Sequence, residues 1–145
     1  MLELLSPAGS MEALRAAVQN GANAVYLGVG NLNARQSAKN FTPQTLVDAV
    51  KYCHVRGVDV HLTLNTLVSD REMKEAAELI RHAAQYNIDA FIVQDLGVVQ
   101  LCRQIAPHIP IHGSTQMTIH SLPGVQLCAA MGMKRVVLSR ELSRE

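Results

Sequence analysis

The sequence predicts an α/β fold in which parallel strands alternate with helices and form an incomplete TIM-type (β/α) barrel, with about six of the eight strand-helix units of a full barrel. Three observations support this fold. A pattern of helix end, turn and strand recurs along the chain, one strand has a polar face, and polar residues follow the apolar strands at their carboxyl ends.

The recurring pattern appears four times. Each copy has a glycine or asparagine at the third position before an expected strand, followed by an apolar residue: Gly21, Gly57, Asn87 and Gly132. These residue types suit the left-handed conformation that ends a helix. The first three copies are separated by about 30 to 36 residues, the length of a strand-helix-strand unit. We therefore expect one supersecondary unit, repeated.

Five segments between the strands have helical signatures. Polar residues at expected amino-terminal caps open four of them, and these are Ser10, Thr42 before Pro43, Ser69 with Glu72 as a capping box, and Asp95. The fifth helix is expected from the apolar spacing of Val125, Cys128 and Met131. A further helix is expected to begin at Leu142.

The strand after Gly57 distinguishes a barrel from an open sheet. His61, Thr63 and Asn65 alternate with apolar residues, whereas strands buried on both faces of an open doubly wound sheet are almost wholly apolar. A barrel with a ligand cavity inside explains the polar face. Because 145 residues fall short of the roughly 250 of a full barrel, we interpret residues 1–145 as the amino-terminal part of a barrel in a longer protein. Its open strand edges are expected to favour self-association.

The composition is that of an ordinary globular domain, with 48% hydrophobic and 17% charged residues and a net charge of +1. No run of Lys and Arg suggests a self-sufficient surface for RNA, so RNA would bind through other regions. No apolar stretch is long enough for a membrane helix, and a cytoplasmic location is expected. Cys53, Cys102 and Cys128 lack metal-ligand spacing, and we expect buried, reduced thiols and no metal site.

The polar residues after the strands form a candidate site. We assign possible catalytic roles to three of them: His112, Asp95 and Glu141. We assign substrate binding to six others, namely Arg35, Asn65, Gln94, Ser114, Gln116 and Arg140. Structural roles stay open, since His112 can be a core histidine, Asp95 can cap a helix, and Arg140 can pair with Glu141. A serine-hydrolase triad is not expected, because no third group orients His112 and Ser114.

Six motifs in this order closely resemble the amino-terminal barrel of the bacterial collagenase-like peptidase family, across essentially the whole chain. They are Glu3–Gly9, Gly21–Tyr26, Thr63–Thr66, Val93–Gly97, His112–Gln116 and Val137–Leu142. The resemblance implies one of two activities for the full-length protein. One is proteolysis, and the other is oxygen-independent hydroxylation of transfer RNA, ribosomal RNA or ubiquinone precursors, with an iron-sulfur cluster and prephenate as hydroxyl donor.

Of these, we favour RNA hydroxylation, with peptide hydrolysis second and a non-catalytic oligomeric scaffold third. In this family the four cysteine ligands of the cluster lie in a later cysteine-rich segment, and Cys53, Cys102 and Cys128 do not match it. We therefore expect no cofactor in this part of the protein and no hydroxylase activity from it alone. Its expected role is to bind a small anionic donor through Arg35, His112, Gln116 and Arg140, or a peptide in the alternative.

Overall fold

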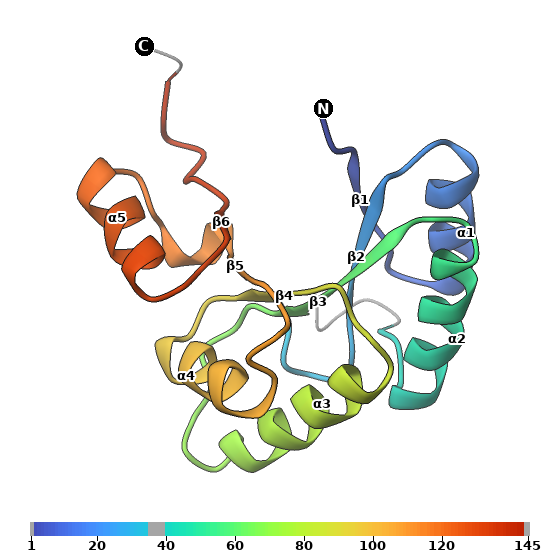
Figure 1. The fold of residues 1–145 in the computed structure, drawn as a ribbon, viewed down its shortest axis with the longest axis horizontal. Helices are drawn as coiled ribbons and strands as arrows, with labels where there is room; N and C mark the ends of the chain where they lie inside the picture. The colour runs from blue at the N-terminus through green and yellow to red at the C-terminus, as the bar shows by residue number, and fades with distance from the viewer. Residues whose placement is uncertain (1, 35–39, 144–145) are drawn as a thin grey trace.

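The computed structural model describes residues 2–34 and 40–143, which form a curled sheet of parallel strands with helices on its outer face (Figure 1). The strands are β1 (Leu5–Pro7), β2 (Ala24–Gly28), β3 (Asp59–Leu64), β4 (Ala90–Val93), β5 (Ile111–Gly113) and β6 (Arg135–Val136). The helices are α1 (Met11–Gln19), α2 (Pro43–His54), α3 (Met73–Gln85), α4 (Leu96–Ile105) and α5 (Leu122–Ala130), with a short 3-10 helix at Thr115–Met117. None of these helices is long and apolar enough to cross a membrane.

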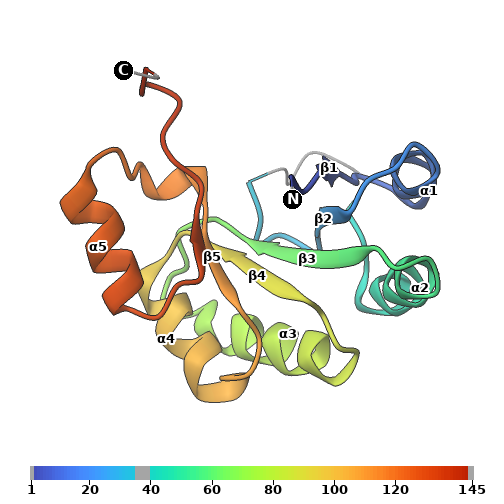
Figure 2. The same ribbon diagram turned by 45° about the horizontal axis from the view of Figure 1, so that its top comes forward.

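The strand order confirms the predicted incomplete barrel. The six strands pair in chain order, β1-β2-β3-β4-β5-β6, and every pair is parallel. A doubly wound sheet reverses its strand order at a switch point and carries helices on both faces, whereas here the order never reverses. Figures 1 and 2 show the helices from α1 to α5 following one another around one side of the sheet, with both chain ends on the other side.

The predicted turns before the strands adopt the conformation that their sequence requires. The backbone φ angle is positive at all four positions of the repeated pattern: 90° at Gly21, 68° at Gly57, 58° at Asn87 and 82° at Gly132. A positive φ strains most residues but not glycine, and asparagine tolerates it better than others. These residues therefore end α1, α2, α3 and α5 and redirect the chain into the next strand.

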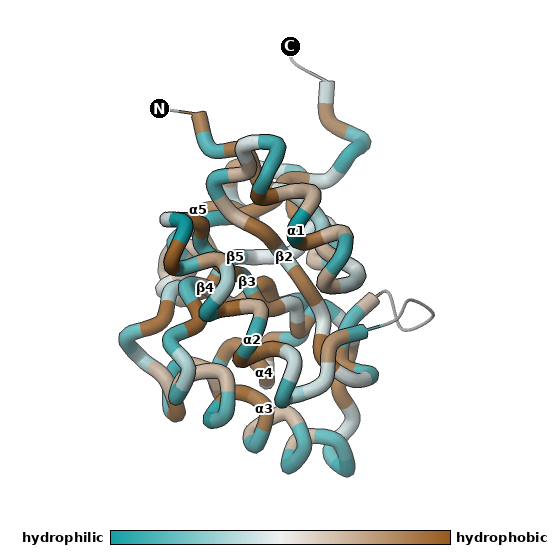
Figure 3. Tube along the Cα trace, turned by 90° about the vertical axis from the view of Figure 1, so that its right-hand side faces the viewer, coloured by the Kyte–Doolittle hydropathy of each residue, from teal (hydrophilic) through white to brown (hydrophobic). Residues whose placement is uncertain are grey.

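The hydrophobic core lies between the sheet and the helices. Val25, Leu62 and Phe91 point outward from the sheet and are fully buried against the inner faces of the helices, where Leu46 and Ile80 are also buried. The outward turns of α3 are hydrophilic in Figure 3, as expected for an amphipathic helix that covers a sheet. Burying one such side chain contributes roughly 1.5 to 3 kcal/mol, so this layer holds the strands in their curl.

Most of the predicted helix starts are confirmed. The side chains of Ser10, Thr42 and Asp95 accept hydrogen bonds from backbone N–H groups in the first turns of α1, α2 and α4. The capping box at Ser69 and Glu72 forms only in part, and α3 begins later than this spacing predicts, at Met73. The Glu72 carboxylate accepts hydrogen bonds from the N–H and hydroxyl of Ser69, which holds a turn before the helix. The helix expected to begin at Leu142 stays a prediction, because the structure describes only its first two residues, 142 and 143.

The concave inner face of the sheet carries polar residues, as the alternation in β3 predicted. Its lower part holds two buried imidazoles, His61 on β3 and His112 on β5, whose ring centroids lie 5.0 Å apart in an edge-to-face arrangement. Ala90 is the register neighbour of His61 on the intervening strand β4, and its small side chain leaves room for the two rings to meet. Nearby, Arg135 donates to both carboxylate oxygens of Glu3, at 2.7 and 3.0 Å.

Candidate functional site

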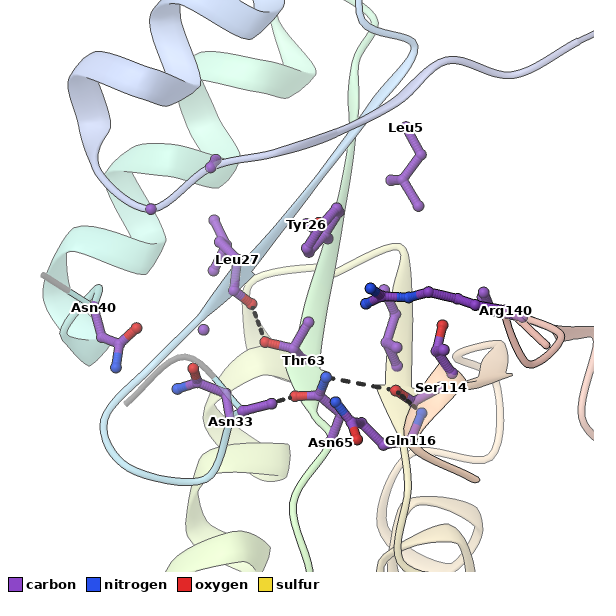
Figure 4. Close-up of a pocket in the computed structure, with 17 residues that line it drawn as sticks. Leu5, Tyr26, Leu27, Asn33, Asn40, Thr63, Asn65, Ser114, Gln116 and Arg140 are labelled. Carbon is purple, nitrogen blue, oxygen red and sulfur yellow. Dashed lines mark hydrogen bonds between the residues drawn. The ribbon is translucent and has the colours of Figure 1, made fainter. Parts of the chain in front are cut away.

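A pocket of about 400 Å³ opens at the carboxyl ends of the strands, on the inner side of the curled sheet (Figure 4). We call it the mouth pocket. Its lining comes from β1 to β6 and the segments that follow them: Leu5, Ala8, Gly9, Tyr26, Leu27, Gly28, Asn33, Ala34, Asn40, Thr63, Asn65, Ile92, Ser114, Thr115, Gln116, Val137 and Arg140. Residues that are far apart in sequence meet here because parallel strands bring their carboxyl ends to one edge of the sheet.

The parallel register places the polar groups of this lining. Thr63 lies level with Gly28 on β2 and Ile92 on β4, and its hydroxyl donates a hydrogen bond of 2.9 Å to the carbonyl of Leu27. Asn65 follows β3 at the next inward-facing position. Ser114 follows β5, and its hydroxyl accepts the N–H of Gln116 at 3.2 Å. Each of these side chains is therefore fixed by the end of a buried strand.

Amides and hydroxyls dominate the polar lining, with one positive charge. Among the described lining residues Arg140 is the cation, and none is an aspartate or glutamate. Guanidinium groups bind carboxylates and phosphates through parallel hydrogen bonds, whereas amides and hydroxyls bind the oxygens of almost any polar ligand. The described pocket is therefore suited to a small, oxygen-rich anion.

Four of the predicted substrate-binding residues line the mouth pocket together: Asn65, Ser114, Gln116 and Arg140. Gln94 lies at its border, where its side-chain amide donates to the carbonyl of Gln116 at 3.2 Å. Gln94 and Gln116 also line an adjoining apolar groove with Leu67, Leu96 and Met117. Arg35 lies outside the described residues.

The structure gives Asp95 and Glu141 contacts within the protein. The Asp95 carboxylate caps α4 by accepting the N–H groups of Gly97 at 2.7 Å and Val98 at 3.2 Å, and it accepts that of Val68 at 3.3 Å. Glu141 accepts a hydrogen bond from the Ser139 hydroxyl. Neither carboxylate is among the residues that line the mouth pocket, so their catalytic roles stay predictions.

His112 is not among the residues that line the mouth pocket, although its register neighbour Ile92 and the nearby Ser114 are. Burial, together with the neighbouring His61 and Arg135, lowers the pKa of His112 to about 4. Burial also lowers the pKa of His61, although Glu3 opposes this shift. Both rings are therefore neutral near pH 7, and the Nδ1 atom of His61 is buried with no hydrogen-bond partner in the part of the chain that the structure describes.

Several lining residues were not predicted as site residues, above all Asn33, Asn40 and Thr63. Asn33 is buried, with 2% of its surface exposed, and its side-chain amide donates to the carbonyl of Gly30 at 3.1 Å. Gly28 makes this position possible, because a Cβ atom there would lie 2.4 Å from Cγ of Asn33. The signal in the sequence was the density of asparagine after β2, but no periodicity indicates which of these side chains turns inward.

The described residues assemble no metal centre. No group of three or more potential metal ligands lies close together in residues 2–34 and 40–143. The three cysteines are buried on three different helices, and burial raises the pKa of Cys53 to about 11 and of Cys102 to about 12. The thiols of Cys53 and Cys102 therefore resist forming the thiolates that metals bind, and all three cysteines pack as core residues.

Comparison with known proteins gives the chain relatives along nearly its full length. It is 42% identical over 143 residues to "tRNA hydroxylation protein P" of Helicobacter pylori, covering 98% of this chain and 34% of that protein. It is 37% identical over 142 residues to "23S rRNA 5-hydroxycytidine C2501 synthase" of Escherichia coli, covering 98% of this chain and 21% of the other. It is 33% identical over 144 residues to "Collagenase" of Porphyromonas gingivalis, covering 99% of this chain and 34% of the other. The chain thus spans about a third or less of the length of these relatives.

The fold also matches a solved structure. The U32 peptidase Mk0906 superimposes with a TM-score of 0.77 and 13% sequence identity, covering 95% of this chain and 58% of that one, which supports the fold. The family model described as "Peptidase family U32" matches residues 9–145, nearly the whole sequence. With the predicted motifs on the expected strands and this match along the sequence, the chain belongs to peptidase family U32.

Proposed function

We propose that the full-length protein hydroxylates a base of transfer or ribosomal RNA, and that the mouth pocket binds the small anionic hydroxyl donor, a molecule such as prephenate. The observation that carries the donor assignment is the lining itself, in which the Arg140 guanidinium faces amides and hydroxyls with no carboxylate among the described lining residues. Two of the relatives carry the names of an RNA hydroxylation protein and an RNA hydroxycytidine synthase, which supports the reaction.

In this proposal Arg140 holds a carboxylate of the donor. The Gln116 side chain is exposed at the rim of the pocket. It and the Asn40 amide can form hydrogen bonds with the remaining oxygens of the bound hydroxyl-donor molecule. His112 is not among the lining residues, although it is the register neighbour of the lining residue Ile92, so we assign it no donor contact here. The RNA binds through regions outside this chain, because the described residues show no cluster of basic side chains around the pocket.

An iron-sulfur cluster does not fit the residues of this chain. Cys53, Cys102 and Cys128 are buried on separate helices and form no ligand group within the described residues. Four thiolates are normally needed for such a cluster. If the full-length protein uses one, its ligands lie in another segment, as in the cysteine-rich segment of the family, and this chain contributes only the donor pocket.

The decisive experiment begins with anaerobic purification of the full-length protein, followed by iron and sulfide analysis. A cluster is expected, and the purified protein is expected to bind prephenate with an affinity that falls at least 10-fold in Arg140→Ala. RNA from cells that lack the protein should lack the hydroxylated nucleosides. Producing the wild-type protein in these cells should restore them, whereas producing Arg140→Ala should not. A protein without iron and sulfide, or one that leaves RNA hydroxylation unchanged, would rule the proposal out.

Peptide hydrolysis is the second candidate, favoured by the relative named a collagenase. Against it, the Ser114 hydroxyl is engaged by Asn65 and Gln116, and the His112 ring packs on His61. Metal-independent cleavage of a collagen-like peptide that disappears in His112→Ala would favour hydrolysis over hydroxylation. A scaffold without activity is the third candidate, and a protein that assembles into oligomers yet shows neither activity would favour it.

A further inference from the structure

The two opposite walls of the mouth pocket come from segments far apart in the chain. One wall is formed at and after the end of β2 by Gly28, Asn33 and Ala34, and the other by Ser114–Gln116 after β5. Strands β3 and β4 lie between them in the sheet. Neither wall is part of a long helix or strand, so something must hold them at a fixed separation if the pocket is to keep its shape.

Asn65, directly after β3, contacts both walls (Figure 4). Its side-chain oxygen accepts the backbone N–H of Ala34 at 3.0 Å, and its side-chain nitrogen lies 3.5 Å from the Ser114 hydroxyl. The same Ser114 oxygen accepts the N–H of Gln116 at 3.2 Å. A backbone N–H can only donate, so the Asn65 amide must present its oxygen to Ala34 and its nitrogen to Ser114.

We propose that Asn65 is a positioning residue, which ties the two walls of the mouth pocket together and keeps it preformed before any ligand binds. Both polar atoms of its side chain already have partners in the protein, which leaves Arg140 and Gln116 better placed to contact a ligand. Preformed sites avoid the entropy cost of ordering their walls during binding. This role differs from direct substrate binding, which the sequence predicted for Asn65.

The first wall is packed firmly at its base, so the Asn65 contact acts on its other end. Asn33 is buried against Gly28, where no Cβ would fit, and Phe41 exchanges backbone hydrogen bonds with Gly28 and Gly30. The base of this wall is therefore held by β2 and Phe41, while the Asn65 contact reaches its far end at Ala34. Loss of that contact is expected to free the end of the wall and to leave its base in place.

The test is hydrogen-deuterium exchange of the ligand-free, full-length protein. Exchange of the Ala34 amide is expected to rise at least 10-fold in Asn65→Ala, while the amides of β3 and β4 keep the wild-type rate. Asn65→Asp is expected to keep Ala34 protected, because a carboxylate can accept both the Ala34 N–H and the Ser114 hydroxyl. Asn20→Ala, which changes an asparagine at the end of α1, is the control and should not affect Ala34.

Wild-type exchange at Ala34 in Asn65→Ala would overturn the proposal. If Asn65→Ala does not fold, Asn65→Ser replaces it with the same expectation, because the shorter hydroxyl cannot reach both walls. Binding of prephenate, whose use as a probe rests on the proposed function, is expected to weaken about 10-fold in Asn65→Ala at unchanged thermal stability. A loss of binding without faster exchange at Ala34 would identify Asn65 as a ligand contact instead. Absence of prephenate binding in the wild type would contradict the donor assignment alone, since the exchange result stands independently.

Discussion

His61 and His112 meet inside the curled sheet, where their environment keeps both imidazoles neutral. Burial is the main cause of the lowered pKa of each ring, and the positive charge of Arg135 adds to it. The Glu3 carboxylate acts in the opposite direction on the histidines. The hydrogen bonds that Glu3 accepts from Arg135 lower the pKa of Glu3 itself. The two histidines are therefore expected to act as buried polar core residues at neutral pH.

This environment predicts a loss of stability in acid. Because the pKa of His112 is about 4 in the folded state and about 6.5 when unfolded, the unfolded chain binds more protons between these values. The contribution of His112 to stability should be fully present above pH 6.5. As the pH drops to 4, the free energy of unfolding should fall by roughly 1 to 3 kcal/mol. Denaturant unfolding at several pH values measures this. His112→Gln should flatten the dependence, whereas the exposed control His108→Gln should not.

A second prediction at the residue scale concerns the space that the small side chain of Ala90 leaves between the two histidines. Ala90 lies on β4 between the strands that carry the two histidines, and 1% of its surface is exposed. Ala90→Leu should push the rings apart and destabilise the protein by about 1 to 3 kcal/mol, the usual cost of overpacking a core. Thermal unfolding measures the loss, with Ala129→Leu on the exposed side of α5 as the control. Equal stability of the two variants would show that the space around Ala90 is not filled.

The strand ends and the helix starts that follow them are the elements that build the site. Strands β2 to β6 each deliver a polar residue to the mouth pocket or to its border, and α1, α2 and α4 each begin with a capping side chain. At β4 the residue after the strand is Gln94, and the next residue, Asp95, caps α4. A polar residue at a strand end therefore has two possible roles, and only its direction distinguishes them.

Asp95 gives a prediction that separates these roles. Asp95→Ala should lower the free energy of unfolding by about 1 to 2 kcal/mol, the usual cost of losing a helix cap, while Asp95→Asn should retain most of it. Urea unfolding measures the difference, with Asp48→Ala on the exposed face of α2 as the control. If Asp95 is catalytic, Asp95→Asn abolishes activity at nearly unchanged stability. Full activity in Asp95→Asn would leave capping as its role.

At the scale of the whole molecule, the sheet has two edges. Within the described residues β1 pairs only with β2 and β6 only with β5, and the Arg135–Glu3 ion pair bridges the lower ends of these two edges. The two side chains are 43% and 34% exposed, so solvent screens the pair and its contribution is at most about 1 kcal/mol. This bridge supports the curl but does not replace strand pairing.

The open edges predict self-association of the 145-residue chain when it is produced alone. Unpaired N–H and C=O groups on β1 and β6 can pair with another copy, so the apparent mass should rise with protein concentration. Analytical ultracentrifugation measures this, and the full-length protein serves as the comparison. A chain that stays monomeric at every concentration would contradict the prediction.

The sequence by itself determined the order of strands and helices, the turns and much of the mouth pocket. The reason is that these depend on local rules: Gly57 and Asn87 have conformations few other residues tolerate, Thr42 caps the next turn, and the alternation from His61 to Asn65 separates the two faces of β3. The predicted start of α3 was too early, because the hydrogen bonds between Ser69 and Glu72 hold a turn and the helix begins after it, at Met73.

Only the tertiary structure decided which polar side chains meet. His112 packs on His61 because Ala90 leaves space between their strands, and Asn33 turns inward because Gly28 has no side chain. Asn65 contacts Ala34 and Ser114 because the curl of the sheet brings both within its reach. The contacts of His112 and Asn65 join residues tens of positions apart, and they depend on register and curvature, which no local pattern encodes.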